Sequence, residues 1–361
     1  MISPVSLAPP PTKVDVTPLE ELIARVAPGA PFHFEGMPGG ASTRRYFRVL
    51  LPEGKTAVAM FVPDGPRPEE VQKLVERPEW PFLEVRTLLE ARGVDVPRVI
   101  AEDTARGWLL IEDLGEDTLA NFLLRNPHEK RELYTRAVSD LARAQVALRD
   151  LPGDSVVASR AFDEDLLRWE IDHFREWGLD ARGRALSADD RAAFDGIGAR
   201  LAKRIAGWKR HFVHRDYQSR NLMVRSSGGI CWIDFQDALL GPRVYDLVAL
   251  LNDSYQEFDR PFVDARLDEF AAAAGLAAKA DRALLGREFD YVTVQRKLKD
   301  AGRFVFIDRV KHNGSFLRFV TPTIRKVHFA LARLEDDEDM RALGSLLRRA
   351  IPDDLAGVGT P

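Results

Sequence analysis

The chain has 361 residues, which is enough for two packed lobes, and its 52 basic and 56 acidic residues give a net charge of −4. This balance gives no indication of binding to nucleic acid or to an anionic membrane surface. The sequence has no apolar run long enough to span a membrane, no recognisable secretory signal, and one cysteine, Cys231, so no internal disulfide can form. We therefore expect a cytoplasmic protein.

The N-terminal third of the chain is predicted to be rich in strands. Residues 1–13 are proline-rich and are predicted to form a disordered tail. A helix is expected to begin at Thr17, with Thr17 as its cap. From about 32 to 112 the pattern predicts strands with one helix near 82–91 among them. We interpret residues 14–113 as a small, β-rich N-lobe that binds nucleotide phosphates and ends in a hinge.

After residue 114 the pattern becomes mainly helical. Helices are predicted near 129–149, near 163–177 and near 187–208. Asp163 and Ser187 are expected to cap the second and third of these helices. Strands with a single helix, followed by a long helical region, predict an α+β fold with the two lobes of a protein kinase. Residues 114–361 would form the helical C-lobe, which carries the catalytic loop and the substrate site.

The motif that carries the most chemical information is His214-Arg215-Asp216, with Asn221 five residues after the aspartate and Asp234 after the next apolar strand. Phosphoryl transfer requires a carboxylate directed at the attacking hydroxyl and oxygen ligands that hold Mg²⁺. We therefore predict that Asp216 is the catalytic base and that Asn221 and Asp234 are Mg²⁺ ligands. Either half of this motif alone would also fit a structural loop beside a hairpin, because Asp and Asn in loops often bond only to backbone.

A glycine-rich turn at residues 39–43 lies between two predicted strands. Glycines let backbone N–H groups approach the phosphates of ATP closely, although the same turn also suits an ordinary hairpin. Nucleotide contacts are predicted for six residues of the N-lobe, the last two of them in the hinge behind the adenine: Gly40, Ser42, Thr43, Arg44, Glu112 and Leu114.

One feature departs from the kinase pattern. The strand at residues 56–62 carries Met60 or Phe61 where a kinase places the lysine that binds the α- and β-phosphates. Arg44, Arg45 and Arg48 are candidates to supply the missing charge, and we expect Arg44 or Arg45 to do so because they are at the neighbouring turn. Glu84, in the following helix, is either the acidic partner at this site or an ordinary surface residue.

The acceptor is expected to be a small molecule. Only residues 235–245 separate Asp234 from Asp246, which leaves no room for the activation segment on which a protein kinase docks its peptide. Substrate contacts are predicted for Asp216 and for four residues of the helical lobe: Glu170, Asp253, Gln295 and Arg296. The planar fork of Arg296 suits a carboxylate, whereas helix-borne charges are also common in surface ion pairs. Trp169 and Trp177 are expected in the core.

Three segments, residues 214–221, 233–238 and 241–247, resemble the motifs of the aminoglycoside phosphotransferase family. Three further segments, residues 41–48, the lysine-free strand that ends at Met60, and residues 294–302, resemble the anomeric amino-sugar kinases within that family. Those kinases act on N-acetylmuramate and N-acetylglucosamine in bacterial cell-wall recycling. The resemblance covers nearly the whole chain beyond the N-terminal tail. It implies ATP and Mg²⁺ as cofactors and a bracing role for the aspartate at position 246.

The same resemblance implies transfer of phosphate to the anomeric C1 hydroxyl of the sugar. A downstream sugar-1-phosphate nucleotidyltransferase would then use the product for peptidoglycan precursors. Two other interpretations stay open from the residues alone. One is a kinase of another small hydroxylated molecule, such as an aminoglycoside or a choline-like amine. The other is an inactive nucleotide-binding regulator, which the missing lysine favours.

Overall fold

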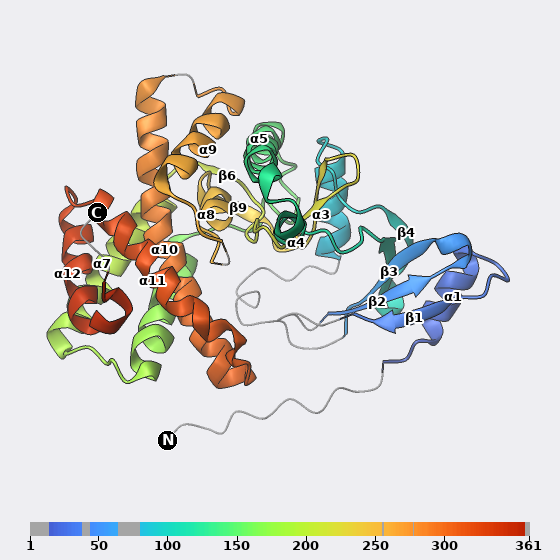
Figure 1. Cartoon of the computed structure of the whole chain (residues 1–361), viewed down its shortest axis with the longest axis horizontal. Coiled ribbons are helices and arrows are strands. Elements are labelled where there is room, and N and C mark those ends of the chain that lie inside the picture. The colour runs from blue at the N-terminus through green and yellow to red at the C-terminus, as the bar shows by residue number, and fades with distance from the viewer. Residues whose placement is uncertain (1–13, 38–43, 64–79, 255, 277, 358–361) are drawn as a thin grey trace. The chain divides into compact units, whose positions relative to one another are not determined.

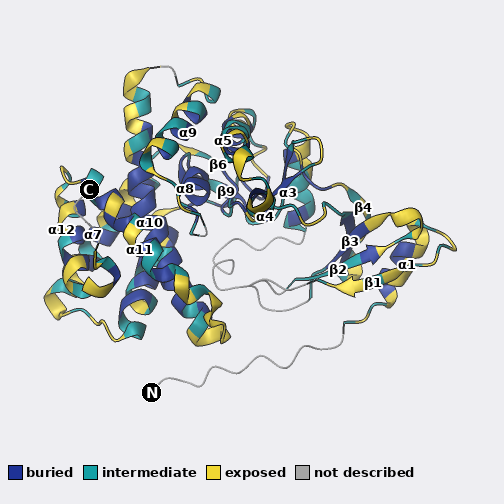
Figure 2. Ribbon diagram, viewed as in Figure 1, coloured by how far each residue is buried: buried dark blue, intermediate teal, exposed yellow. Residues whose placement is uncertain are grey.

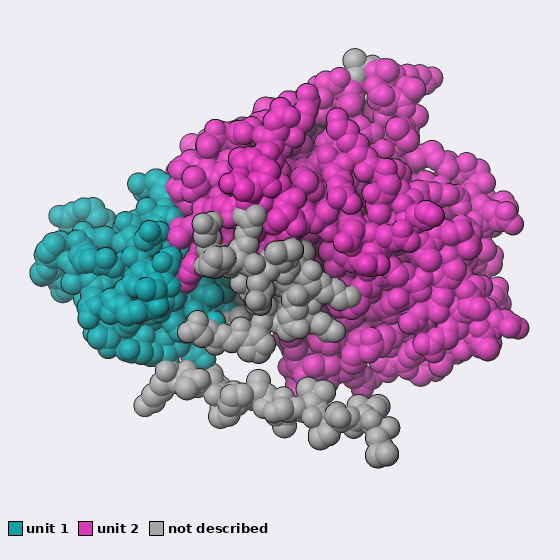
Figure 3. Space-filling model, turned by 180° about the vertical axis from the view of Figure 1, so that it is seen from behind, with its two compact units in different colours: residues 1–72, 97–115 teal, residues 73–96, 116–361 magenta. Residues whose placement is uncertain are grey.

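The computed structural model describes residues 14–37, 44–63, 80–254, 256–276 and 278–357 (Figure 1). The chain divides into two compact units, unit 1 with residues 1–72 and 97–115 and unit 2 with residues 73–96 and 116–361 (Figure 3). Unit 1 is rich in strands and unit 2 in helices, so the predicted α+β fold with a small β-rich part and a larger helical part is confirmed. The lobe boundary at residue 113 stays a prediction.

Unit 1 is built on an antiparallel sheet of five strands in the order β1-β2-β3-β5-β4. The strands are β1 (His33–Gly36), β2 (Arg45–Leu50), β3 (Thr56–Phe61), β4 (Val99–Asp103) and β5 (Trp108–Glu112). Strand β3 pairs with β2 on one side and with β5 on the other, which places Met60 opposite Tyr46 and Leu109. Its central position explains why this strand is almost entirely buried.

Helix α1 (Thr17–Val26) supplies one side of the core of unit 1. Its buried side chains Leu19, Leu22 and Ile23 pack with Val49, Ala57, Ala59, Trp108 and Leu110 of the sheet. The predicted cap at Thr17 is wrong, because Val16 occupies the N-cap position and makes no side-chain bond there. Instead the Asp15 carboxylate accepts the N–H of Thr17 at 3.0 Å, so an acidic side chain just before the helix satisfies this donor.

Unit 2 is mainly helical. Its helices are α3 (Pro81–Glu90), α4 (Leu119–Arg125), α5 (Lys130–Ala147), α6 (Glu164–His173), α7 (Ala188–Ala206), α8 (Tyr245–Leu251), α9 (Arg260–Ala273), α10 (Lys279–Lys311), α11 (Val320–Arg333) and α12 (Glu338–Ala350). The predicted caps of two helices are confirmed: Asp163 accepts the N–H of Leu166 at 2.8 Å, and Ser187 accepts that of Asp190 at 3.1 Å. Helix α3 follows β3 in sequence but is grouped with unit 2.

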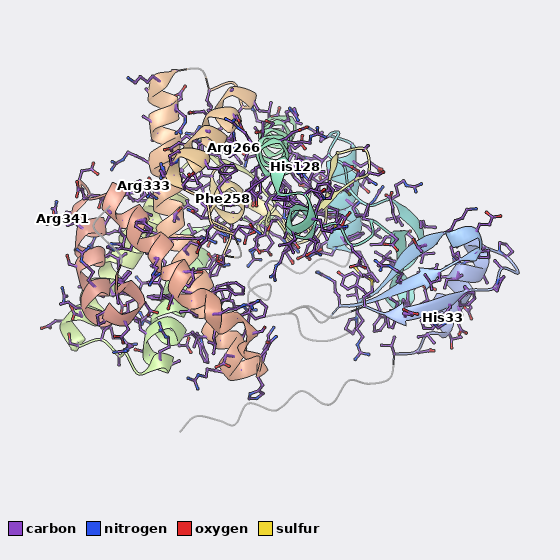
Figure 4. The ribbon with its side chains drawn as sticks, viewed as in Figure 1. His33, His128, Phe258, Arg266, Arg333 and Arg341 are labelled. Carbon is purple, nitrogen blue, oxygen red and sulfur yellow. The ribbon has the colours of Figure 1, made fainter. Side chains whose placement is uncertain are left out.

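The core of unit 2 gathers around α8 and the middle of α10. All seven residues of α8 are buried, as the dark blue ribbon in Figure 2 shows. Helix α10 has 33 residues and packs against α11, α6 and α8. Arg333 of α11, labelled in Figure 4, donates to Asp290 of α10 at 2.8 Å and so ties these two helices together.

Two short antiparallel strand pairs position the candidate site within unit 2. Strand β6 (Arg210–Val213) pairs with β9 (Leu239–Pro242), and β7 (Leu222–Val224) pairs with β8 (Ile230–Trp232). The loop from β6 to β7 carries the His-Arg-Asp motif, and the loop from β8 to β9 carries Asp234. Among helices in the described ranges, none is long and apolar enough to cross a lipid bilayer.

Candidate active site

The catalytic loop, residues 214–221, is anchored at its start by a buried carboxylate. Asp246 of α8 is fully buried and accepts the backbone N–H of His214 at 2.6 Å and that of Arg215 at 3.0 Å. Burial raises the pKa of Asp246 to about 7, and the two amide donors oppose this shift because they stabilise the anion. The contacts agree with the bracing role expected for this aspartate.

Arg215 adopts a backbone conformation that is rare for a non-glycine residue, with φ at 80°. Hydrogen bonds on both sides hold it there. Its N–H is bound by Asp246, and its carbonyl accepts the Nη1 of Arg296 at 2.9 Å. Arg296 is fully buried, and its guanidinium also packs 4.5 Å from the ring centre of Tyr245. Strained backbone of this kind persists only where the surroundings determine it fully.

The carboxylate of Asp216, next in the chain, is 42% exposed and has Arg296 Nη2 at 3.7 Å from its Oδ1. Desolvation by the surrounding protein would by itself raise the pKa of Asp216. The positive charges of Arg296, Lys299 and Arg215 outweigh that effect, so the pKa is held below its ordinary value. The carboxylate is therefore ionised near neutral pH, as a proton acceptor must be.

Asn221 and Asp234 lie at the same, open end of the hairpin formed by β7 and β8, where Leu222 pairs with Trp232. The Nδ2 of Asn221 donates to the carbonyl of Asp216 at 2.8 Å, which fixes the amide and orients its oxygen. Asp234 has φ at 64° and accepts the Nε2 of Gln236 at 2.9 Å. A carboxylate and an amide oxygen are the ligand types that Mg²⁺ takes when phosphate oxygens complete its shell, so both residues fit that ion.

The loop that carries Asp234 is supported by an aromatic contact with helix α3. Phe235 is fully buried and stacks on Phe82 of α3, with ring centres 5.1 Å apart. Glu84 of the same helix accepts the backbone N–H of Val156, so this carboxylate anchors a loop of unit 2 rather than lying on an open surface. Helix α3 thus supports the candidate metal site within unit 2.

Four of the five predicted substrate contacts, all but Asp216, are buried and bonded to protein groups. Asp253 accepts both the N–H of Ser219, at 3.2 Å, and its hydroxyl, at 2.6 Å. Glu170 accepts the Nε2 of Gln295 at 2.8 Å, and each of these two side chains is at most 1% exposed. These contacts, and that of Arg296 with the Arg215 carbonyl, brace the catalytic loop and the helices beneath it. Direct contact of these residues with substrate stays a prediction.

The predicted nucleotide residues belong to unit 1 or lie outside the described residues. Gly40, Ser42 and Thr43 fall outside them, so the expected phosphate loop stays a prediction. Arg44 immediately precedes β2, Glu112 ends β5 and accepts the N–H of Arg98 at 3.2 Å, and Leu114 is partly buried. Their contacts with nucleotide stay predictions as well.

Both candidates for the position of the missing lysine are apolar. Met60 is 1% exposed in the central strand β3, and Phe61, the last residue of that strand, is partly buried. Arg48 of β2 is engaged elsewhere, since its Nε donates to Asp113 at 2.8 Å and its Nη2 to the same carboxylate at 3.3 Å. Asp113 in turn accepts the N–H of Gly115 at 2.9 Å. This pair, which the sequence analysis did not identify, fixes the segment after β5 within unit 1.

Sequence reasoning also missed Lys299 as a neighbour of the base. Its charge is one of those that lower the pKa of Asp216, and its Nζ pairs with Asp300 at 3.2 Å. The available signal was its spacing: Lys299 follows Arg296 by one helical turn, so both side chains lie on one face of α10.

Comparisons with known proteins define the class. A family model described as phosphotransferase enzyme family matches residues 33–283. The aminoglycoside phosphotransferase APH(2'')-Ib in its ADP-bound form has a similar fold, with a TM-score of 0.55 and 14% identity over 86% of this chain and 97% of that one. The choline kinase LicA from Streptococcus pneumoniae matches equally well, with the same TM-score, identity and coverage. The fold is therefore the two-lobed, protein-kinase-like one, as predicted.

Curated relatives are more similar in sequence. The N-acetylmuramate/N-acetylglucosamine kinase of Pseudomonas aeruginosa is 34% identical over 312 residues, which cover 85% of this chain and 85% of the relative. The protein of the same name from Neisseria meningitidis is 32% identical, covering 79% of this chain and 82% of the relative. The chain belongs to the phosphotransferase enzyme family. It is an ATP-dependent phosphotransferase that acts on a hydroxyl group, and its relatives indicate a sugar kinase.

Proposed function

We propose that this protein transfers the γ-phosphate of ATP to the anomeric C1 hydroxyl of N-acetylmuramate or N-acetylglucosamine and releases the sugar 1-phosphate. The observation that carries the choice of sugar is the 34% identity, over 85% of the chain, to a relative with that name. The chemistry is supported by an ionised Asp216 on a loop that Asp246 and Arg296 hold rigidly.

The proposed base suits this acceptor. An anomeric hydroxyl is more acidic than an ordinary alcohol, because the ring oxygen withdraws electron density from C1. A carboxylate with a lowered pKa is a weak base, and it suffices when the proton leaves late in a loose transition state. In the proposed step the hydroxyl proton passes to a carboxylate oxygen of Asp216 while the C1 oxygen bonds to the γ-phosphorus and the bond to the ADP oxygen breaks.

Asn221 and Asp234 would hold Mg²⁺, which neutralises negative charge on the phosphates when it is bound. The hydrogen bond from Asn221 to the Asp216 carbonyl would keep base and metal ligand in a fixed relation. In unit 1, the turn at residues 39–43 and either Arg44 or Arg45 would contact the phosphates, and Glu112 and Leu114 would lie near the adenine. The sugar 1-phosphate is the form that a nucleotidyltransferase activates, and we propose such an enzyme as the next step, in peptidoglycan recycling.

The test is to incubate the purified protein with ATP and Mg²⁺ against N-acetylmuramate, N-acetylglucosamine, glucose and kanamycin, and to locate new phosphate by ³¹P NMR. We expect a 1-phosphate on the acetamido sugars, identified by its coupling to the anomeric proton. Phosphate on another sugar carbon would disprove the anomeric assignment. Transfer to kanamycin alone would make the protein an aminoglycoside kinase, and ATP binding without transfer to any acceptor would indicate a regulator.

A further inference from the structure

Two segments of unit 2 approach each other closely where α6 and the turn after it pack on α10. Helix α6 continues into a π-helical turn, η4 (Phe174–Leu179), and both pack along α10. At Gly302 the approach is so close that a Cβ would lie 2.8 Å from the His173 carbonyl oxygen and 2.9 Å from the Phe174 Cα. Single π-helical turns inside helices are frequent at functional sites.

Aromatic rings from both segments meet on one side of this contact. His173 lies between Trp169 and Phe306, with ring centres 5.4 and 5.5 Å away, and Trp177 packs edge-on against Phe306 at 5.1 Å. Both tryptophans and Phe306 are only partly buried. Trp169 and Trp177, which the sequence analysis assigned to the core, thus expose part of their ring surface.

Two cations, Arg303 and Lys299, are carried by the same helix as Phe306. The guanidinium of Arg303 is 4.8 Å from the ring centre of Phe306. Burial lowers the pKa of His173 to about 3, and the charges of Arg303 and Lys299 act in the same direction. The charge of Lys299 also lowers the pKa of Asp216, so it affects both the proposed base and His173. Arg296, whose Nη2 is 3.7 Å from the Asp216 carboxylate, precedes Lys299 by three residues and Arg303 by seven. This spacing places the three cations on one face of α10, which leads from the proposed base to the exposed rings.

We propose that these six residues, Trp169, His173, Trp177, Lys299, Arg303 and Phe306, form an acceptor face that binds a sugar carrying a carboxylate. This inference rests on the proposed function and names the substrate class that the site prefers. Trp177 and Phe306 would pack on the C–H face of the pyranose ring, and Lys299 and Arg303 would bind the carboxylate. Within the two candidate sugars, the acid, N-acetylmuramate, is then the better substrate.

The geometry favours Lys299 and Arg303 over Arg296 as the groups that bind the substrate carboxylate. Arg296 is fully buried and donates to the Arg215 carbonyl, so it is committed to the loop. Lys299 keeps 15% of its side chain exposed, and Arg303 is partly exposed one turn further along α10. A planar guanidinium beside an apolar ring is well suited to a carboxylate, because it can donate two parallel hydrogen bonds.

The experiment compares kcat/KM for the two sugars in Arg303→Gln and in the matched control Arg309→Gln. Arg309 is on the same helix, but its side chain is 59% exposed and pairs with Asp308. We expect Arg303→Gln to lower kcat/KM for N-acetylmuramate by about tenfold or more, which is the usual range for a lost charged hydrogen bond, and to leave N-acetylglucosamine within about twofold. The control should change neither.

A second variant keeps the inference testable if the arginine only supports the fold. Trp177→Ala should raise KM for both sugars and leave the affinity for ADP unchanged, as measured by calorimetry. Equal losses on both sugars in Arg303→Gln, or no loss on either, would overturn the acceptor face while leaving the kinase assignment intact. If the wild-type protein transferred phosphate to neither sugar, the proposed function itself would fail, and the acceptor face with it.

Discussion

The catalytic loop and the acceptor face share helix α10 but are built in opposite ways. The loop is fixed by fully buried polar groups, with Asp246 on the amides of His214 and Arg215 and Arg296 on the carbonyl that follows. In the acceptor face, Trp177, Phe306 and Arg303 are partly exposed, and Phe306 contacts both Trp177 and Arg303. The difference indicates that the geometry of phosphate transfer is rigid, whereas the choice of sugar depends on an open surface that substitutions can alter without disturbing the loop.

The largest expected effect comes from a change in the catalytic loop, at the proposed base. Asp216→Asn removes the proposed proton acceptor and keeps the size of the side chain. We expect kcat to fall by about 10²- to 10⁴-fold, the usual contribution of positioned acid–base catalysis. The affinity for ADP should stay within about twofold, since Asp216 is not among the predicted nucleotide contacts. Steady-state kinetics and calorimetry measure both quantities. Turnover close to that of the wild type would show that Asp216 is not the base.

The next prediction concerns Asp246, the buried carboxylate that holds the start of the catalytic loop. Asp246→Ala leaves two buried amides, those of His214 and Arg215, without their acceptor. Each unsatisfied buried donor costs about 1–3 kcal/mol, so we expect the free energy of unfolding to fall by about 2–6 kcal/mol and kcat to fall with it. Urea unfolding measures the stability.

A matched control for this variant is Asp336→Ala. The Asp336 carboxylate pairs with Arg287 at 3.0 Å and is 65% exposed. Exposed pairs contribute about 0–1 kcal/mol, so this loss should be small. Equal losses in the two variants would mean that Asp246 does not hold the loop.

The same contrast explains what the sequence could predict. The loop was identifiable because its residues are consecutive, and Asp216, Asn221 and Asp234 follow a spacing that phosphate transfer requires. The acceptor face was not identifiable, since its members come from two segments more than a hundred residues apart, and only the packing of α10 on η4 brings Trp177 next to Phe306. Apolar rings at helical spacing also predict a core equally well.

The role of Asp253 shows a further limit. The predicted contact of Asp253 with substrate stays a prediction, whereas the two hydrogen bonds that its carboxylate accepts from Ser219 were not predicted. Composition and spacing do not indicate which buried partner an acidic side chain will find. The tertiary fold decides this, because it sets which donors are buried nearby.

The close packing beneath the acceptor face gives the next prediction. In Gly302→Ala the new methyl group meets backbone atoms of His173 and Phe174, which cannot move aside as a flexible side chain can. We expect a loss of about 1–3 kcal/mol in the free energy of unfolding and a higher KM for the sugar. Gly286→Ala on the same helix is the control, since its Cβ would meet only the end of Arg282 at 3.2 Å. That change should stabilise by about 0.5–1 kcal/mol. A stabilising effect of both changes would rule out the tight contact at Gly302.

The smallest expected effect concerns the pH dependence of stability. His173 is 5% exposed, and burial together with Arg303 and Lys299 lowers its pKa from the usual 6.5 to about 3. Between these two pH values the unfolded chain binds a proton at this histidine that the folded chain does not bind. The free energy of unfolding therefore falls as the pH is lowered through this window, by about 1 kcal/mol per pH unit for one proton.

His173→Phe keeps a ring between Trp169 and Phe306 but removes the titration. Urea unfolding at pH 7, 6 and 5 should show that the variant loses about 1 kcal/mol less per pH unit than the wild type below pH 6. The other buried histidines are present in both proteins, so the difference between the two slopes isolates this one group. Identical slopes would mean that His173 becomes protonated without unfolding, and the cluster of rings and cations around it would then be more open to water than the packing of α6 on α10 indicates.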